Sequence, residues 1–160
     1  MTCDDKPKRI GLIAHDACKR DMTEWVRFNA RKLVRHKLYC TGTTGKLIEG
    51  VLTAECEGGP VDLTIFKSGP LGGDQQMGAL IASDQLDILI FFTDPMTMQP
   101  HDVDIKALIR ISTIANIVVA CTRSTADYII TSSMFDREYE PEKKTYESYT
   151  DRKVRLSGRR

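Results

Sequence analysis

A loop with three glycines and one carboxylate is the first place in this sequence where chemistry is expected. It reads Ser68-Gly69-Pro70-Leu71-Gly72-Gly73-Asp74, follows an apolar run at residues 63–66 and leads into a helical pattern at residues 77–81. A strand, a glycine-rich loop and a helix start together present backbone N–H groups to an anion. Taken alone, Asp74 fits either a functional carboxylate or an N-cap or first-turn residue that the helix dipole stabilises.

A second anion-binding pattern, Thr41-Gly42-Thr43-Thr44-Gly45, follows the apolar run at residues 38–40. Its hydroxyls and free amides at a helix start suit a phosphate, and a ligand-free capping turn is the alternative. The sequence has neither the P-loop spacing nor the G-x-G-x-x-G of dinucleotide sites. Lys19, four residues after His15, is either a positive charge that reaches the same edge of the sheet or an ordinary surface lysine.

Imidazoles and further carboxylates follow the apolar runs as well. They are His15, Asp16, Asp94, His101 and Asp104. A neutral imidazole can donate a hydrogen bond to a carbonyl oxygen that becomes an enolate, and a carboxylate can take up the proton that is removed. A metal site is not expected, because no H-x-x-x-H or H-E-x-x-H spacing occurs.

The elements that must position these groups alternate along the chain. Short continuous apolar runs, typical of buried strands, occupy residues 10–14, 38–40, 63–66, 87–92 and 117–120, with helical patterns between them. We therefore predict a single α/β domain, a doubly wound and mainly five-stranded parallel sheet with helices on both faces. Ligands bind outside the carboxyl ends of such strands, where nearly all of these polar clusters fall.

Composition narrows the class of protein. The 160 residues are 41% hydrophobic and 28% charged with a net charge of +1, which fits a globular domain and gives no electrostatic case for nucleic acid or a membrane surface. The five cysteines form no C-x-x-C pair, and residues 1–9 resemble no secretory signal, so a cytoplasmic protein is expected. We predict a polar extension at 1–9, one domain at 10–136 and a charged tail at 137–160, which is a surface helix, a partner-binding tail or partly disordered.

Five motifs in series resemble the methylglyoxal synthase family, over about residues 10–130. They are His15-Asp16-x-x-Lys19, Thr41-Gly42-Thr43-Thr44-Gly45, Ser68-Gly69-Pro70-Leu71-Gly72-Gly73-Asp74-Gln75-Gln76, Phe91-Phe92-x-Asp94-Pro95 and Pro100-His101-Asp102-x-Asp104. The resemblance implies a methylglyoxal synthase-like fold and a lyase, free of cofactor and metal, that converts dihydroxyacetone phosphate to methylglyoxal and inorganic phosphate. It also implies a homohexamer that phosphate inhibits.

The resemblance assigns roles to individual residues. Asp74 would be the base that takes the proton from the hydroxymethyl carbon, and His101 would polarise the carbonyl. Asp104 and Asp16 would assist proton movement or orient their partners, and His15 would border the substrate. The phosphate would be held by Lys19, Thr41, Gly42, Thr43, Thr44, Ser68 and Gly69.

The charged tail departs from the family pattern, so phosphate regulation and hexamer contacts are less firmly implied than the active site. Arg152 is the nearest match to a family arginine that helps form the phosphate site of a neighbouring subunit. Two other functions stay open at this point. One is a non-catalytic regulatory module of the same fold that senses a small ligand, and the other is an isomerase that keeps the phosphate.

Overall fold

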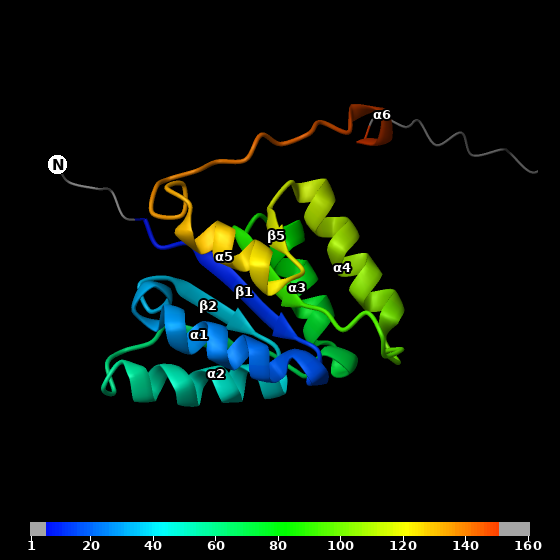
Figure 1. Cartoon of the computed structure of the whole chain (residues 1–160). Helices are drawn as coiled ribbons and strands as arrows, with labels where there is room; N and C mark the ends of the chain where they lie inside the picture. Colours follow the sequence, from blue (N-terminus) through cyan, green and yellow to red (C-terminus); the bar gives the residue numbers. More distant parts are fainter. Residues whose placement is uncertain (1–5, 151–160) are drawn as a thin grey trace, which may run out of the picture.

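A five-stranded parallel sheet in the order β3-β2-β1-β4-β5 forms the centre of the computed structural model, which describes residues 6–150 (Figure 1). The strands are β1 (Arg9–Ala14), β2 (Lys37–Cys40), β3 (Leu63–Ile65), β4 (Ile88–Phe92) and β5 (Val118–Ala120). Every strand pairing in it is parallel. The predicted fold class is confirmed, and each strand lies within one residue of a predicted apolar run at both ends.

Helices cover both faces of the sheet. One face packs against α1 (Lys19–Leu33), α2 (Gly42–Glu55) and α5 (Arg123–Thr131), and the other packs against α3 (Gly73–Ala82) and α4 (Asp102–Ala115). Two short 3-10 turns, Asp16–Cys18 and Gly69–Leu71, precede α1 and α3. The pattern at residues 41–45 leads into α2, and the loop at residues 68–74 leads into α3. Both anion-binding patterns therefore lie at helix starts, as the sequence predicted.

The two faces of β1 show why the run at its centre is apolar throughout. Leu12 packs in the core under α1, whereas Ile13 packs in the core under α3 and α4. Side chains alternate between the faces of a strand, and both faces are buried here. Gly11 leaves room for α3, because a Cβ at this position would lie 2.7 Å from the Met77 sulfur.

The strand order reverses between β1 and β4, which is the switch point where doubly wound sheets bind ligands. The two strands run in register to their ends, with Ala14 beside Phe92. The chain continues into His15 on one side and towards Asp94 on the other. These polar residues therefore leave the sheet side by side at its carboxyl edge.

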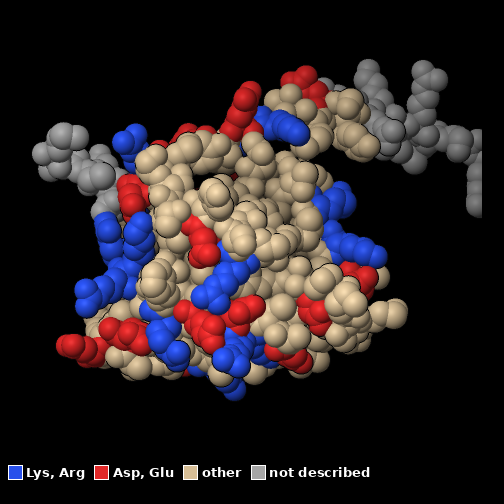
Figure 2. Space-filling view, viewed as in Figure 1, with Lys and Arg blue, Asp and Glu red and all other residues tan. Residues whose placement is uncertain are grey.

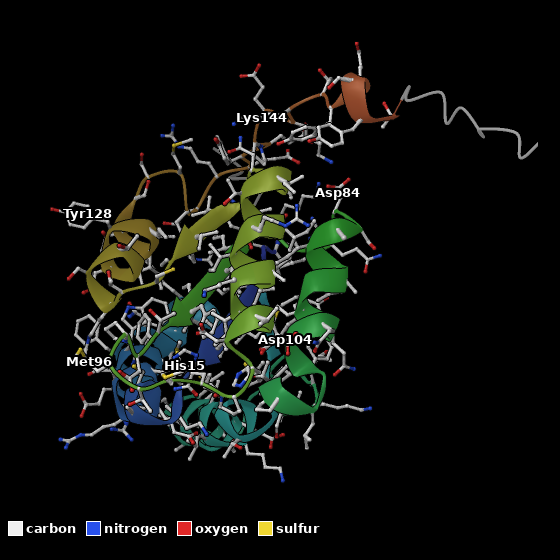
Figure 3. The ribbon with its side chains drawn as sticks, turned by 90° about the vertical axis from the view of Figure 1, so that its right-hand side faces the viewer. His15, Asp84, Met96, Asp104, Tyr128 and Lys144 are labelled. Carbon is white, nitrogen blue, oxygen red and sulfur yellow. The ribbon has the colours of Figure 1, made fainter. Side chains whose placement is uncertain are left out.

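The opposite, amino edge carries the charged tail. Glu138 pairs with Lys6 at 3.0 Å and Lys143 pairs with Asp84 at 2.6 Å, so the segment from 137 to 146 lies against the domain as an extended strap. The short, exposed helix α6 (Glu147–Thr150) follows it. In Figure 3, Asp84 and Lys144 lie at the end of the molecule opposite His15.

Three features of the tail and the ends stay predictions. Arg152 lies outside the described residues, so its role is one of them. Cys3 also lies outside them, and the other cysteines are free thiols: Cys18, Cys40, Cys56 and Cys121. Partner binding by the tail and the division of the chain after residues 9 and 136 likewise stay predictions.

Within residues 6–150, no helix combines the length and the apolar character that crossing a bilayer requires. Figure 2 shows lysine and arginine interspersed with aspartate and glutamate over the face that it presents. This mixture agrees with the balanced net charge of the sequence.

A buried histidine joins three segments at the amino edge. His36 Nδ1 accepts a hydrogen bond from the Lys8 amide at 3.1 Å, and its ring meets the edge of Phe135 at 5.1 Å between centroids. Burial lowers the pKa of His36, the nearby Arg35, Lys8 and Lys32 lower it further, and only Asp136 opposes them. The folded protein therefore favours the neutral ring.

Acidification below about pH 6.5 is expected to destabilise the wild type partly through this ring, because the unfolded chain then binds the proton that the folded ring resists. His36→Phe keeps an aromatic contact with Phe135 but cannot titrate. Urea unfolding should show the variant about 1 kcal/mol less stable at pH 7.5, since the Lys8 amide loses its acceptor. The difference should shrink at pH 5.5. A difference that stays constant with pH would contradict this account.

Candidate active site

Most of the predicted site residues line one pocket of about 290 Å³ at the carboxyl edge of the sheet. Those brought together are His15, Asp16, Lys19, Thr41, Thr43, Thr44, Ser68, Gly69, Asp74 and His101. Gly42 and Asp104 lie beside this pocket rather than in its lining. The strands and helix starts that carry these residues are far apart in sequence, so the fold brings them together.

Buried polar atoms without partners distinguish this pocket. Across residues 6–150, the buried side-chain nitrogens and oxygens that lack a hydrogen-bond partner are His15 Nε2, Asp74 Oδ2 and His101 Nδ1. Leaving such a group unpaired costs about 1–3 kcal/mol, so each of them is suited to a ligand. All three residues line the pocket.

A larger hollow of about 750 Å³ lies at the amino edge, beneath the strap. Its charged groups already satisfy one another: Arg9 Nη2 lies 2.7 Å from an Asp87 oxygen, and Lys143 pairs with Asp84 at 2.6 Å. Its size reflects the open space under the strap. The smaller pocket is the better candidate, because its polar groups still lack partners.

Asp74 is the most buried carboxylate of the site, with 3% of the residue exposed. Its Oδ2 lies 3.4 Å from His101 Nε2, without a hydrogen bond. The residue is second in α3, after Gly72 at the N-cap position, and no side chain caps that helix. Asp74 therefore does not occupy the N-cap position but lies in the first turn of α3, where the helix dipole stabilises a carboxylate.

Burial raises the pKa of Asp74, Asp104 raises it further, and His101 acts in the opposite direction. The carboxylate is consequently a stronger base than an exposed aspartate. A raised pKa in a pocket with a specific charge partner is typical of a functional group. The arrangement can take a proton from a carbon acid.

The glycine at position 69 leaves space next to this carboxylate. A Cβ at Gly69 would lie 3.1 Å from both Asp74 carboxylate oxygens and 3.2 Å from His101 Nε2. The main chain at Gly69 thus approaches both groups, and the missing side chain leaves space over them. A ligand atom that contacts the base needs this space.

The start of α2 provides the other wall. Gly42 donates its amide to Phe66 O at 3.1 Å, and Gly45 donates to Thr41 O at 2.9 Å. The amides of Thr43 and Thr44 lie in the first turn, where a helix has no carbonyl to accept them. Together with the helix dipole, they favour an anion such as phosphate.

Two details adjust the predictions for this wall. Thr41 precedes α2 but makes no side-chain cap, so its hydroxyl is available to a ligand. Gly42 packs against the Ser68 main chain, because a Cβ there would lie 2.8 Å from the Ser68 Cα and nitrogen. This glycine allows the two anion-binding loops to lie against each other.

Lys19 and Asp16 form the charged entrance. Lys19 Nζ lies 2.5 Å from Asp16 Oδ1, and the lysine side chain is 21% exposed whereas the aspartate side chain is 94% exposed. The hydrogen bond from Lys19 lowers the pKa of Asp16. The Lys19 ammonium group therefore lies at the pocket, and its partner Asp16 is exposed to solvent, so a ligand can replace Asp16 as the partner of Lys19.

Asp104 lies near Asp74 on the side that faces the groove between α3 and α4. It lies on the first turn of α4, and both aspartates line a groove of about 230 Å³ between α3 and α4. Figure 3 shows Asp104 and His15 at the same end of the molecule. Asp74 thus separates the pocket from this groove.

Sequence reasoning missed part of the lining. Gln99 and Pro100 enter from the loop after β4, and the Phe91 ring supports His15 edge-on at 5.0 Å between centroids. The buried run at residues 87–92 identified Phe91 as a core residue but carried no signal of this contact. No group of three His, Cys, Asp or Glu side chains within residues 6–150 is arranged to hold a metal ion.

Comparison with known proteins gives consistent matches. A family model described as an MGS-like domain matches residues 21–121. The methylglyoxal synthase of Coxiella burnetii RSA 493 is 48% identical over 91% of this chain and 96% of its own length. That of Leptospira interrogans serovar Lai is 54% identical over 83% of this chain and 85% of its own length. The crystal structure of methylglyoxal synthase from Elizabethkingia anophelis NUHP1 superposes with a TM-score of 0.83 at 46% identity and covers 94% of this chain and 95% of its own.

Proposed function

This chain belongs to the methylglyoxal synthase family, and we propose that the pocket at the carboxyl edge of its sheet converts dihydroxyacetone phosphate to methylglyoxal and inorganic phosphate. The observation that supports this site most strongly is the buried, unpaired Asp74 carboxylate 3.4 Å from His101 Nε2. A phosphate-binding helix start forms the wall beside it.

Binding uses both anion-binding loops. The phosphate lies at the start of α2, where the Thr43 and Thr44 amides and the hydroxyls of the loop point. Lys19 leaves Asp16 and pairs with the phosphate. Ser68 and Gly69 contribute from the other loop and direct the carbon chain towards Asp74.

The first chemical step is proton transfer. Asp74 takes a proton from the hydroxymethyl carbon next to the ketone, and the electron pair moves onto the ketone oxygen to give an enediolate. His101 stabilises that oxygen with an N–H group, and a donor aimed at developing charge is typically a large contribution. Asp104, in the groove behind Asp74, assists the later movement of the proton.

The second step expels the phosphate. The hydroxyl group of the deprotonated carbon gives its proton to the departing phosphate and becomes the aldehyde carbonyl. The electron pair of the enediolate double bond moves to form a double bond to the methylene carbon, as the carbon–oxygen bond to phosphate breaks and phosphate leaves with the bonding electrons. The enolate that remains takes up the proton held by Asp74 on its methylene carbon to become methylglyoxal. The breaking bond must be aligned with the π system of the enediolate. A phosphate held at the start of α2 fixes this rotation and favours elimination over isomerisation.

Removal of the Lys19 charge should separate binding from chemistry. Lys19→Gln is expected to raise the KM for dihydroxyacetone phosphate about tenfold or more, because a charge-assisted contact to phosphate is worth roughly 1.5–3 kcal/mol. The kcat should change much less, since the base and His101 remain. Initial rates over a range of substrate concentrations measure both. An unchanged KM would contradict a phosphate-binding role for Lys19.

The products released from dihydroxyacetone phosphate show which reaction the protein catalyses. Purified protein with dihydroxyacetone phosphate should release inorganic phosphate and methylglyoxal in equal amounts. An isomerase would form glyceraldehyde phosphate without free phosphate, and a regulatory module would bind the substrate without forming either product. Either of these results would overturn the proposal.

Assembly, regulation and location are proposed with it. The protein forms a homohexamer in the cytoplasm, and inorganic phosphate inhibits it allosterically. Light scattering after size-exclusion chromatography tests the hexamer, and cell fractionation tests the location. Initial rates in the presence of phosphate should depend sigmoidally on the substrate concentration, and rates that stay hyperbolic would contradict allosteric inhibition.

A further inference from the structure

The loop after β4 controls which nitrogen of His15 carries the proton. His15 and Asp94 follow the two neighbouring strands at the switch point, and the His15 amide donates to Phe92 O at 3.1 Å, which continues the sheet to this position. The Asp94 amide then donates to His15 Nδ1 at 2.8 Å. This hydrogen bond joins the segment that follows β1 to the segment that follows β4.

A main-chain amide can only donate, so the nitrogen that it contacts must be an unprotonated acceptor. The proton of the neutral ring is then on Nε2. That atom is buried, has no partner within residues 6–150, and belongs to a residue of the pocket lining. A buried N–H group without an acceptor is suited to an oxygen of the ligand.

The Asp94 carboxylate acts on its own loop. Its Oδ1 accepts the Met96 amide at 2.9 Å, a side-chain turn typical of aspartate. Hydrogen bonds from the Thr97 side chain and the Met96 amide lower the pKa of Asp94. The carboxylate is not part of the pocket lining, so it does not contact the ligand directly.

We propose that Asp94 is a positioning residue for the reaction: its carboxylate folds the loop so that its own amide holds His15 neutral, with the Nε2 proton directed at the substrate. This inference rests on the proposed function. His15 then supplies a second N–H donor beside His101, with ring centroids 6.3 Å apart.

The electrostatics of His15 agree with this role. Burial lowers the pKa of His15, and His101 lowers it further. The carboxylates of Asp94, Asp102 and Asp16 oppose that shift. A charged ring would have a proton on Nδ1 and would lose the bond from the Asp94 amide.

Asp94→Ala and Asp94→Asn test the proposal together. The asparagine keeps a side-chain oxygen that can accept the Met96 amide, whereas the alanine removes it. Asp94→Ala should lower kcat by up to about 10²-fold, the scale of an active-site group displaced by about 1 Å, with little change in KM. Asp94→Asn should retain kcat within a few-fold. Asp102→Ala, which removes an exposed carboxylate paired with Lys106 at 3.2 Å, is the matched control and should retain wild-type kcat.

Nitrogen NMR of the His15 ring provides the decisive readout besides rate. The wild type, the Asn variant and the Asp102→Ala control should show a protonated Nε2 and an unprotonated Nδ1 at pH 7.5. The Ala variant should show a mixture of tautomers. A wild-type ring protonated at Nδ1, or an Ala variant with unchanged tautomer and kcat, overturns the inference. So does an Asn variant as slow as the Ala variant, since charge rather than the turn would then be responsible.

These outcomes are distinct from failure of the proposed function. If the wild type releases no phosphate from dihydroxyacetone phosphate, the function is wrong whatever tautomer His15 adopts. If the wild type is active and the Ala variant keeps both its tautomer and its rate, only the role of Asp94 is wrong.

Discussion

Asp74→Asn is expected to lower turnover by about 10²-fold or more, the usual contribution of a positioned base. The amide has nearly the same shape as the carboxylate but cannot accept the proton. The phosphate-binding start of α2 is a separate wall of the pocket and does not change. The loss should therefore appear in kcat, with substrate binding largely intact.

Initial rates and calorimetry with a phosphate analogue measure the two effects separately. The analogue should bind Asp74→Asn with an affinity close to that of the wild type. Asp102→Asn, which changes an exposed carboxylate at the start of α4, is the matched control and should retain wild-type turnover. An Asp74→Asn enzyme that remains active would overturn the assignment of the base.

The pH dependence of the wild type provides an independent check on the same group. Because burial and Asp104 raise the pKa of Asp74, the base is protonated at a higher pH than an exposed aspartate would be. The kcat/KM should therefore fall on acidification at a pH above the ordinary aspartate range of about 3.9. A profile that stays flat down to that range would mean that another group is the base.

The sheet and its polar edge were predictable because both follow from local patterns. A continuous apolar run such as residues 87–92 indicates a strand buried on both faces, and alternation with helices indicates a parallel sheet. The carboxyl edge then collects the residues that follow each strand. His15, Lys19 and Ser68 meet in the pocket for this reason.

Other features depend on contacts between distant segments. The first turn of α2, which begins at Gly42, was predicted from its anion-binding pattern alone, because glycine and threonine carry no apolar periodicity. The sequence did not reveal that His101, from another element, faces Asp74. Asp94 is a harder case, since its backbone makes the contact and the side-chain type does not reveal it.

Gly69→Ala is the second change with a large expected effect, a loss of turnover on the order of 10²-fold, as expected when reacting groups are displaced by about 1 Å. Gly69 lacks the positive φ found at Gly72, so alanine fits the backbone and the protein should fold. Its Cβ would lie 3.1 Å from both Asp74 oxygens, in the space that a substrate carbon needs to reach the base.

A matched glycine separates this steric effect from any general effect of alanine. Gly50 on α2 has no atom within 4 Å of a Cβ, so Gly50→Ala should retain full activity and gain about 0.5–1 kcal/mol of stability from helix propensity. Initial rates and urea unfolding of both variants provide the comparison. Since the start of α2 is unchanged in Gly69→Ala, inorganic phosphate should still bind it. A Gly69→Ala enzyme with wild-type kcat would show that the substrate does not approach Asp74 from this side, and the carbon acid would have to meet the base through the groove that Asp104 lines instead.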